Sequence, residues 1–164
     1  MKDFTAKEQE IISTANNIIL SRFKKYPLLN SPKLIRKYLV SKLVMEENTF
    51  RILLLNEAFC LIDDVPLTLG TIDISSVYAR DVMGEILQKY AKAAMKIVIE
   101  HNASAILMVH SHPQGFVYPS NADKEITTQI TAALGLVGVR VIDHVILAGD
   151  KTYSFSEHGI LGAK

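Results

Sequence analysis

The chain is short of cysteine, since Cys60 is the only one among its 164 residues. A single cysteine excludes an intrachain disulfide, and disulfides persist mainly in oxidising compartments. The first ten residues, MKDFTAKEQE, also lack the apolar stretch of a secretion signal. We therefore expect a protein that works in the reducing cytoplasm.

Long apolar runs and an excess of charge of one sign are lacking as well. No apolar run approaches the roughly 20 residues of a membrane-spanning helix, so we expect no membrane partner. The 18 basic and 17 acidic residues leave a formal net charge of +1. This balance gives no support for direct nucleic-acid binding. The hydrophobic content of 49% is that of an ordinary globular protein.

Two helices are expected ahead of the first strand. Residues 6–23 carry apolar side chains at helical spacing, and Pro27 ends the segment. The serine and proline at 31–32 offer a cap and a first-turn proline for a second helix, KLIRKYLVSKL. We treat residues 1–44 as a helical leader and residues 45–164 as the main domain.

The main domain is expected to combine strands with helices. Its predicted elements are strands in FRILLLN, FCLIDDVPLT and LGTIDI, a helix from Val77 to His101, a buried strand at 104–110, a helix from Asn121 to Leu136, and strands in VRVIDHVILAG and TYSFSE. This order predicts an α/β or α+β fold in which helices pack on a central sheet.

The stretch VHSHPQGFVYPSNADKE, residues 109–125, carries the most suggestive polar pattern. His110 and His112 end a predicted strand, and residues two apart in a strand point to the same face. Asp123 falls in the first turn of the next predicted helix, from which its carboxylate can turn back towards the strand end. Two imidazoles and a carboxylate would leave the fourth position of a tetrahedral Zn²⁺ for water, the arrangement of a catalytic site.

The same residues have a purely structural interpretation. Ser120 is a good helix cap, and an acid at Asp123 interacts favourably with the helix dipole without any metal. Two histidines near a loop are weak evidence on their own. The two interpretations are compatible, because a helix that begins at Ser120 delivers Asp123 to the histidines.

The joint spacing resembles the signature of the JAMM (MPN) metalloproteases, which is His-x-His, seven residues, Ser, two residues and Asp. Here His110, His112, Ser120 and Asp123 fill it. The letters HSHPQG, PS and D, followed later by DHVIL, resemble the bacterial RadC-like branch of this family. The resemblance covers roughly residues 27–161. It implies a JAB/MPN-like fold, a central mixed β-sheet flanked by helices with cytidine-deaminase-like layering.

The resemblance also implies a role for each signature residue. His110, His112 and Asp123 would bind one Zn²⁺ per chain, and Ser120 would donate a hydrogen bond to the oxyanion of the reaction. A metal-activated water would then cleave a peptide or isopeptide bond in a protein or peptide substrate.

Four further residues are candidates for contacts behind the metal or with the substrate. Ser111 and Gln114 replace the asparagine and serine that the branch favours, so substrate contacts are expected to differ. Asp143 and His144 belong to the DHVIL strand, although His144 has the alternative of a purely structural role. The helix expected over residues 80–104 is longer than is usual in the branch.

The general base is where this chain departs from the family pattern. RadC-like chains place a glutamate before the first core strand, and aligning Phe50 puts Asn48 at that position. Glu47 is the preferred base because a one-residue bulge would present it correctly. Glu46 is the alternative because it would share a strand face with Asn48. If neither glutamate reaches the site, zinc would bind without hydrolysis.

Two functions remain open on the sequence. The first is a zinc metallopeptidase with an unidentified protein substrate. The second is a non-catalytic zinc-binding or protein-interaction module, which the RadC name links historically to DNA repair.

Overall fold

The computed structural model describes residues 5–25, 32–43, 50–67, 80–112, 115–149 and 151–161. Their elements are α1 (Ala6–Phe23), α2 (Pro32–Leu43), β1 (Phe50–Leu55), β2 (Leu61–Pro66), α3 (Arg80–Glu100), β3 (Ala105–Ser111), α4 (Asn121–Gly135), β4 (Arg140–Ala148) and β5 (Lys151–Ser154). The order of helices and strands predicted from the sequence is confirmed. The strand expected in LGTIDI lies outside the described residues.

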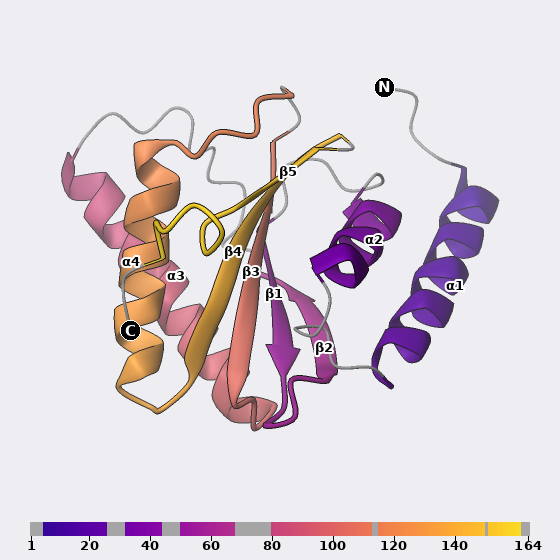
Figure 1. The fold of residues 1–164 in the computed structure, drawn as a ribbon, viewed down its shortest axis with the longest axis horizontal. Helices are drawn as coiled ribbons and strands as arrows, with labels where there is room; N and C mark the ends of the chain where they lie inside the picture. Colours follow the sequence, from indigo (N-terminus) through magenta and orange to yellow (C-terminus); the bar gives the residue numbers. More distant parts are fainter. Residues whose placement is uncertain are drawn as a thin grey trace.

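The five strands form one mixed sheet in the order β2-β1-β3-β4-β5. Only β3 and β4 pair in parallel, and α4 makes the crossover between them. Helices α3 and α4 lie on one side of the sheet, and α1 and α2 lie on the other (Figure 1). The expected central mixed sheet flanked by helices is therefore confirmed.

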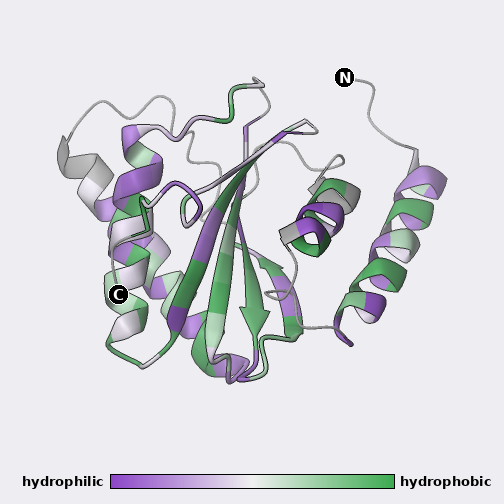
Figure 2. Cartoon of the chain, viewed as in Figure 1, coloured by the Kyte–Doolittle hydropathy of each residue, from purple (hydrophilic) through white to green (hydrophobic). Residues whose placement is uncertain are grey.

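Strand β3 is the middle strand of the sheet, and apolar side chains cover both of its faces. Ile106 and Met108 belong to the core cluster that includes residues of α3 and α4, whereas Leu107 and Val109 belong to the cluster that includes residues of α2. The inner strands are accordingly hydrophobic along most of their length, while the helices show hydrophilic residues as well (Figure 2). A strand that is buried on both faces is expected to be apolar without interruption, as in the run AILMV at residues 105–109.

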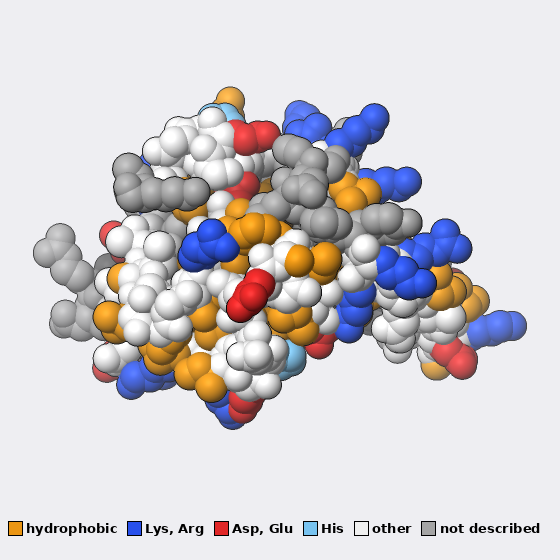
Figure 3. All heavy atoms as spheres, turned by 60° about the horizontal axis from the view of Figure 1, so that its bottom comes forward, with side chains coloured by type: hydrophobic (Ala, Val, Ile, Leu, Met, Phe, Trp, Pro, Cys, Tyr) orange, Lys and Arg blue, Asp and Glu red, His pale blue; other side chains and the backbone are white. Residues whose placement is uncertain are grey.

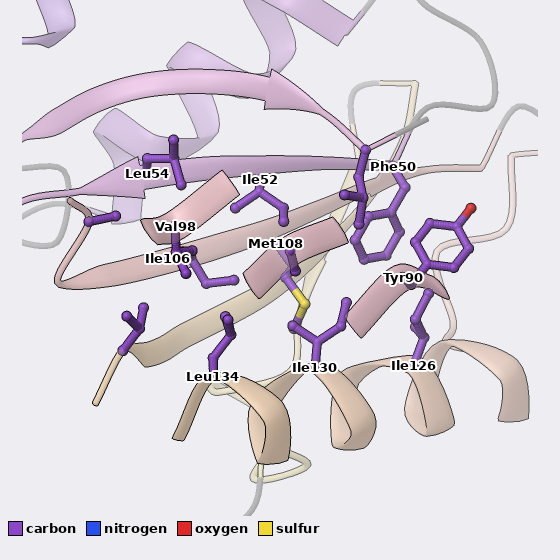
Figure 4. Packing of buried hydrophobic residues seen from close by; sticks show 14 of the residues in the cluster. Phe50, Ile52, Leu54, Tyr90, Val98, Ile106, Met108, Ile126, Ile130 and Leu134 are labelled. Atoms are coloured by element: carbon purple, nitrogen blue, oxygen red, sulfur yellow. The ribbon is translucent and has the colours of Figure 1, made fainter. Parts of the chain in front are cut away.

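The larger core cluster fixes α3 and α4 against the sheet (Figure 4). Phe50 of β1, Met108 of β3 and Ile130 of α4 are buried together in it. The rings of Phe50 and Tyr90 lie 5.5 Å apart. Burying each such side chain contributes roughly 1.5–3 kcal/mol. This packing sets the position of α4 relative to the end of β3, where the predicted site begins.

Helix α2 takes part in the second core cluster, on the opposite face. Tyr38 and Leu39 are fully buried there. The Tyr38 hydroxyl donates to Asp64 at 2.5 Å, and Arg51 donates to the other oxygen of the same carboxylate at 2.6 Å. Burial and the neighbouring Asp64 raise the pKa of Tyr38, so its hydroxyl remains a donor. Helix α1, in contrast, contains no buried residue. The predicted domain boundary after residue 44 stays a prediction.

Helix α3 ends earlier than the range 80–104 expected from the sequence. Its last residue is Glu100, and Asn102 has a φ of 49°, in the left-handed region. A left-handed residue ends the helical pattern, and asparagine tolerates this conformation better than most residues. The N–H of Ala103 closes the end by donating to the carbonyl of Val98 at 2.9 Å. The predicted end at His101 is therefore within one residue of the observed end, and only the longer range up to residue 104 is wrong.

Charged side chains are unevenly spread on the face shown in Figure 3. Most of the lysine and arginine side chains in that view lie on the right, where α1 and α2 are. Among the described residues, no helix combines the length and the apolar character of a membrane span.

Candidate metal centre

The end of β3 and the first turn of α4 bring His110, His112 and Asp123 together. One ligand atom from each residue lies within 4.8 Å of those of the other two. Nδ1 of His110 is 2.9 Å from Oδ1 of Asp123, and Nε2 of His112 is 3.5 Å from Oδ2. The two imidazole rings are nearly perpendicular, with centroids 4.7 Å apart. The three residues form a group that could hold a metal ion, as the sequence pattern suggested.

The strand ladder keeps the two histidines on one side. His110 pairs with Ile146 of β4, and the N–H of His112 donates to the carbonyl of Leu147 at 2.7 Å. Because side chains alternate along an extended chain, Ser111 points to the other face, where it is buried. Ser111 is therefore placed away from the group of ligand atoms.

A capping box at the start of α4 holds the carboxylate of Asp123. Ser120 is the helix N-cap, and its hydroxyl accepts from the N–H of Asp123 at 3.2 Å. The hydroxyl and the backbone N–H of Ser120 both donate to Oδ2 of Asp123, at 2.6 and 2.7 Å. The capping interpretation is thus confirmed, and the cap also aims the acid at the histidines. A hydrogen bond from Ser120 to an oxyanion would have to replace its bond to Asp123.

Asp123 is only 4% exposed, but it favours the ionised form. Burial alone would raise its pKa. The hydrogen bonds from His110 and Ser120 outweigh burial and hold the pKa of Asp123 well below its usual range. An ionised carboxylate is the form that binds a metal.

The hydrogen bond of His112 identifies the nitrogen that is open to a metal. Its Nδ1 lies 2.8 Å from the carbonyl oxygen of Phe116. Since a carbonyl oxygen only accepts, Nδ1 carries the proton, and the neutral ring keeps its lone pair on Nε2. Metal-binding histidines are commonly anchored in this way. Two imidazoles and one carboxylate are a donor set that suits zinc and leaves an open position.

The proposed catalytic glutamates cannot be placed beside this group. Glu46, Glu47 and the substrate candidate Gln114 lie outside the described residues. The identity of the general base therefore stays a prediction.

A bulge in β4 separates the two residues of the DHVIL strand that were predicted for the site. Val141 pairs with Ile106, but Asp143 pairs with Leu107, so Ile142 is an extra residue. Both Ile142 and Asp143 consequently line the face that carries α2, next to a cavity of about 460 Å³. Asp143 is held there by hydrogen bonds from Ser154 at 2.5 Å and from the N–H of Ser156 at 2.9 Å. Its carboxylate does not take part in the candidate metal-binding group of His110, His112 and Asp123.

The same bulge turns His144 towards α4. His144 is fully buried, and its Nδ1 lies 2.7 Å from Oγ1 of Thr127. Burial lowers the pKa of His144 to about 3, so its ring is neutral. Thr127 was not predicted as a site residue, although its helical spacing of four from Asp123 was a usable signal.

This sheet and its group of two histidines and an aspartate define a class: an α/β domain with a candidate metal centre at the carboxyl end of its central strand. The family model described as "RadC-like JAB domain" matches residues 29–95 and 90–160. The chain therefore belongs to the RadC-like JAB domain family.

Individual relatives agree with this assignment. The chain is 37% identical over 156 residues to a UPF0758 protein of Vibrio cholerae serotype O1, covering 94% of this chain and 91% of the relative. It is 39% identical over 132 residues to the UPF0758 protein YeeS of Escherichia coli (strain K12), covering 80% and 81%. A UPF0758 protein of Aeromonas hydrophila is 34% identical over 157 residues, and the chain spans 65% of its length.

Proposed function

We propose that this protein is a zinc-dependent hydrolase of the JAMM type that cleaves a peptide or isopeptide bond. The observation that carries the proposal is the approach of three ligand atoms, from His110, His112 and Asp123, to within 4.8 Å of one another. Zinc in this site would supply Lewis acidity and a water whose pKa is lowered to about 7.

The protein's own residues supply the remaining steps. Asp123 and His112 present a carboxylate oxygen and Nε2 in fixed orientations. Glu47 is the proposed base that takes a proton from the attacking water and passes it to the leaving amine, with Glu46 as the alternative. Ser120 is proposed to exchange its bond to Asp123 for one to the oxyanion.

The proposed substrate is a protein or peptide, and the proposed compartment is the cytoplasm. The formal net charge of +1 favours a protein partner over a nucleic acid. The alternative is a zinc-binding interaction module without activity. It is supported by Asn48 at the aligned base position and by the engagement of the Ser120 hydroxyl with Asp123.

The test begins with zinc content, measured by elemental analysis of the purified protein. We expect about one zinc per chain, lost in His110→Ala and His112→Ala. His101→Ala is the matched control, because His101 lies at the end of α3 and bonds to the carbonyl of Ile97. A wild-type protein that neither contains nor takes up zinc would falsify the proposal.

Hydrolysis is then measured on isopeptide- and peptide-linked substrates. Glu47→Gln should retain zinc and lose turnover, while Glu46→Gln should retain both. Turnover that survives in Glu47→Gln and disappears in Glu46→Gln would assign the base to Glu46. Zinc binding without hydrolysis of either bond type in the wild type would favour the interaction module.

A further inference from the structure

The buried residues Thr127 and His144 join α4 to β4 behind the candidate metal centre. Oγ1 of Thr127 lies 2.5 Å from the backbone oxygen of Asp123 and 2.7 Å from Nδ1 of His144. A carbonyl oxygen only accepts hydrogen bonds, and threonine has a single O–H to donate. The hydroxyl therefore donates to Asp123, and His144 donates its Nδ1–H to the hydroxyl oxygen.

This direction leaves the lone pair of the neutral His144 ring on Nε2. That atom is buried and has no hydrogen-bond partner among the described residues. The ring is instead surrounded by apolar rings, with Phe155 stacked at 4.5 Å and Phe50 edge-on at 5.5 Å between centroids. A buried polar atom without a partner is destabilising. Packing alone would therefore favour phenylalanine at this position, and the useful feature of histidine is its Nδ1–H.

The same ring touches the supports of two residues of the metal-binding group. Through Thr127, His144 is connected to the backbone of Asp123 in the first turn of α4. Through Phe50, whose ring lies 5.7 Å from that of His110, it backs the imidazole at the end of β3. His144 thus connects the helix that carries the acid with the sheet that carries the histidines.

We propose that the hydrogen bond between Thr127 and His144 positions Asp123 for metal binding, by fixing the first turn of α4 against the sheet. The inference rests on the proposed zinc site and adds two positioning residues outside it. Because an anchored ligand loses less freedom when it binds an ion, loosening the anchor lowers affinity. Removing supporting hydrogen bonds of this kind weakens metal binding by roughly 10- to 100-fold.

The test is the zinc affinity of the whole chain, measured by competition with a chromophoric chelator. His144→Phe keeps an aromatic ring but removes the donor, and Thr127→Val removes the hydroxyl. Both should weaken zinc binding by roughly 10- to 100-fold. Thr127→Ser keeps a hydroxyl and should recover most of the affinity.

Thr131→Val is the matched control. The Thr131 hydroxyl donates to the carbonyl of Thr127 at 2.7 Å, which is the same bond within the helix one turn further on. Among the described residues it makes no hydrogen bond to β4. The zinc affinity of Thr131→Val should equal that of the wild type. A loss of zinc affinity as large as that in Thr127→Val would overturn the proposal.

Thermal unfolding of the metal-free protein distinguishes a role of His144 in positioning Asp123 from a role in the stability of the whole fold. His144→Phe removes the unpartnered Nε2, so its unfolding temperature should be unchanged or higher while its zinc affinity falls. Wild-type zinc affinity in His144→Phe, or an affinity loss matched by a large fall in unfolding temperature, would overturn the proposal. If the wild type itself binds no zinc, the proposed function fails, and this inference fails with it.

A long-range ¹H–¹⁵N spectrum of the histidine rings checks the hydrogen-bond direction without any metal. We expect His144 to carry its proton on Nδ1. A proton on Nε2 would reverse the assigned direction and overturn the proposal even if the protein binds zinc.

Discussion

The carboxylate of Asp123 accepts hydrogen bonds both from the strand and from its own helix. Oδ1 faces Nδ1 of His110 at 2.9 Å, whereas Oδ2 accepts twice from Ser120. The bonds from Ser120 do not involve the histidines, so they can persist when the histidines bind an ion. At this scale, one serine both begins a helix and orients the carboxylate of a candidate metal ligand.

Ser120→Ala should therefore affect stability and metal binding together. Loss of an N-cap lowers the free energy of unfolding by about 1 kcal/mol, measured by urea denaturation, and zinc affinity should fall as well. Thr5→Ala is the matched control, because Thr5 and Glu8 form the same capping box on the exposed α1. It should leave zinc affinity unchanged; an equal loss of affinity in both variants would contradict this role of Ser120.

The neutral ring of His144 predicts a pH dependence of stability in the metal-free protein. Burial lowers its pKa from 6.5 to about 3, so between these values the unfolded chain binds one more proton than the folded protein. This part of the stability is fully present above pH 6.5 and is lost as the pH falls towards 3. The slope amounts to at most about 1.4 kcal/mol per pH unit.

His144→Phe should remove this part of the acid sensitivity. The measurement is the free energy of unfolding between pH 7 and 3.5 with a chelator present, compared between variant and wild type. Curves that stay parallel over this range would contradict a buried neutral His144.

Among the helices, α1 and α2 differ in their contribution to the core. Helix α2 places Leu39 among the fully buried side chains, whereas Ile18 of α1 is 52% exposed. Both helices precede the first strand, so the sequence pattern alone grouped them as one leader. Leu39 of α2 is buried within a core cluster of the sheet, and Ile19, Leu20 and Phe23 of α1 are partly buried against the same cluster.

Leu39→Ala should destabilise the protein by about 2–5 kcal/mol, because it removes a buried side chain and leaves a cavity. Ile18→Ala should change the free energy of unfolding by less than about 0.5 kcal/mol. Chemical denaturation of the two variants measures the difference. Equal losses of unfolding free energy in the two variants would mean that α1 contributes to the core as much as α2 does.

For the whole molecule, a metal at the end of the central strand would link helix and sheet. Zinc that binds only the folded state stabilises it by about 2.7 kcal/mol when its free concentration is 100 times the Kd. We expect the unfolding temperature to rise with zinc and to return to its starting value with excess chelator. His112→Ala should show no rise, and a wild-type temperature that zinc leaves unchanged would contradict the proposed site.

The order of helices and strands could be predicted from the sequence, because the spacing of apolar residues and the positions of turn residues indicate the same elements along this chain. The strand at 104–110 and the helix from Asn121 were predicted to within a residue or two. The helix end predicted at His101 lies one residue beyond the observed Glu100, whereas the range to residue 104 was too long because the left-handed Asn102 ends the helix.

The sequence by itself predicted the candidate metal-binding group, because His110 and His112 share a strand face and Ser120 begins the helix that carries Asp123. It could not determine which residue of the pair Asp143 and His144 lies on the same side of the sheet as that group. Strict alternation after Val141 would have turned Asp143 towards α4. Only the tertiary structure decided the matter, since the extra residue Ile142 reverses the alternation and brings His144 to Thr127. A bulge depends on how a strand pairs with its neighbour, and pairing is set by the packed sheet rather than by the strand's own residues.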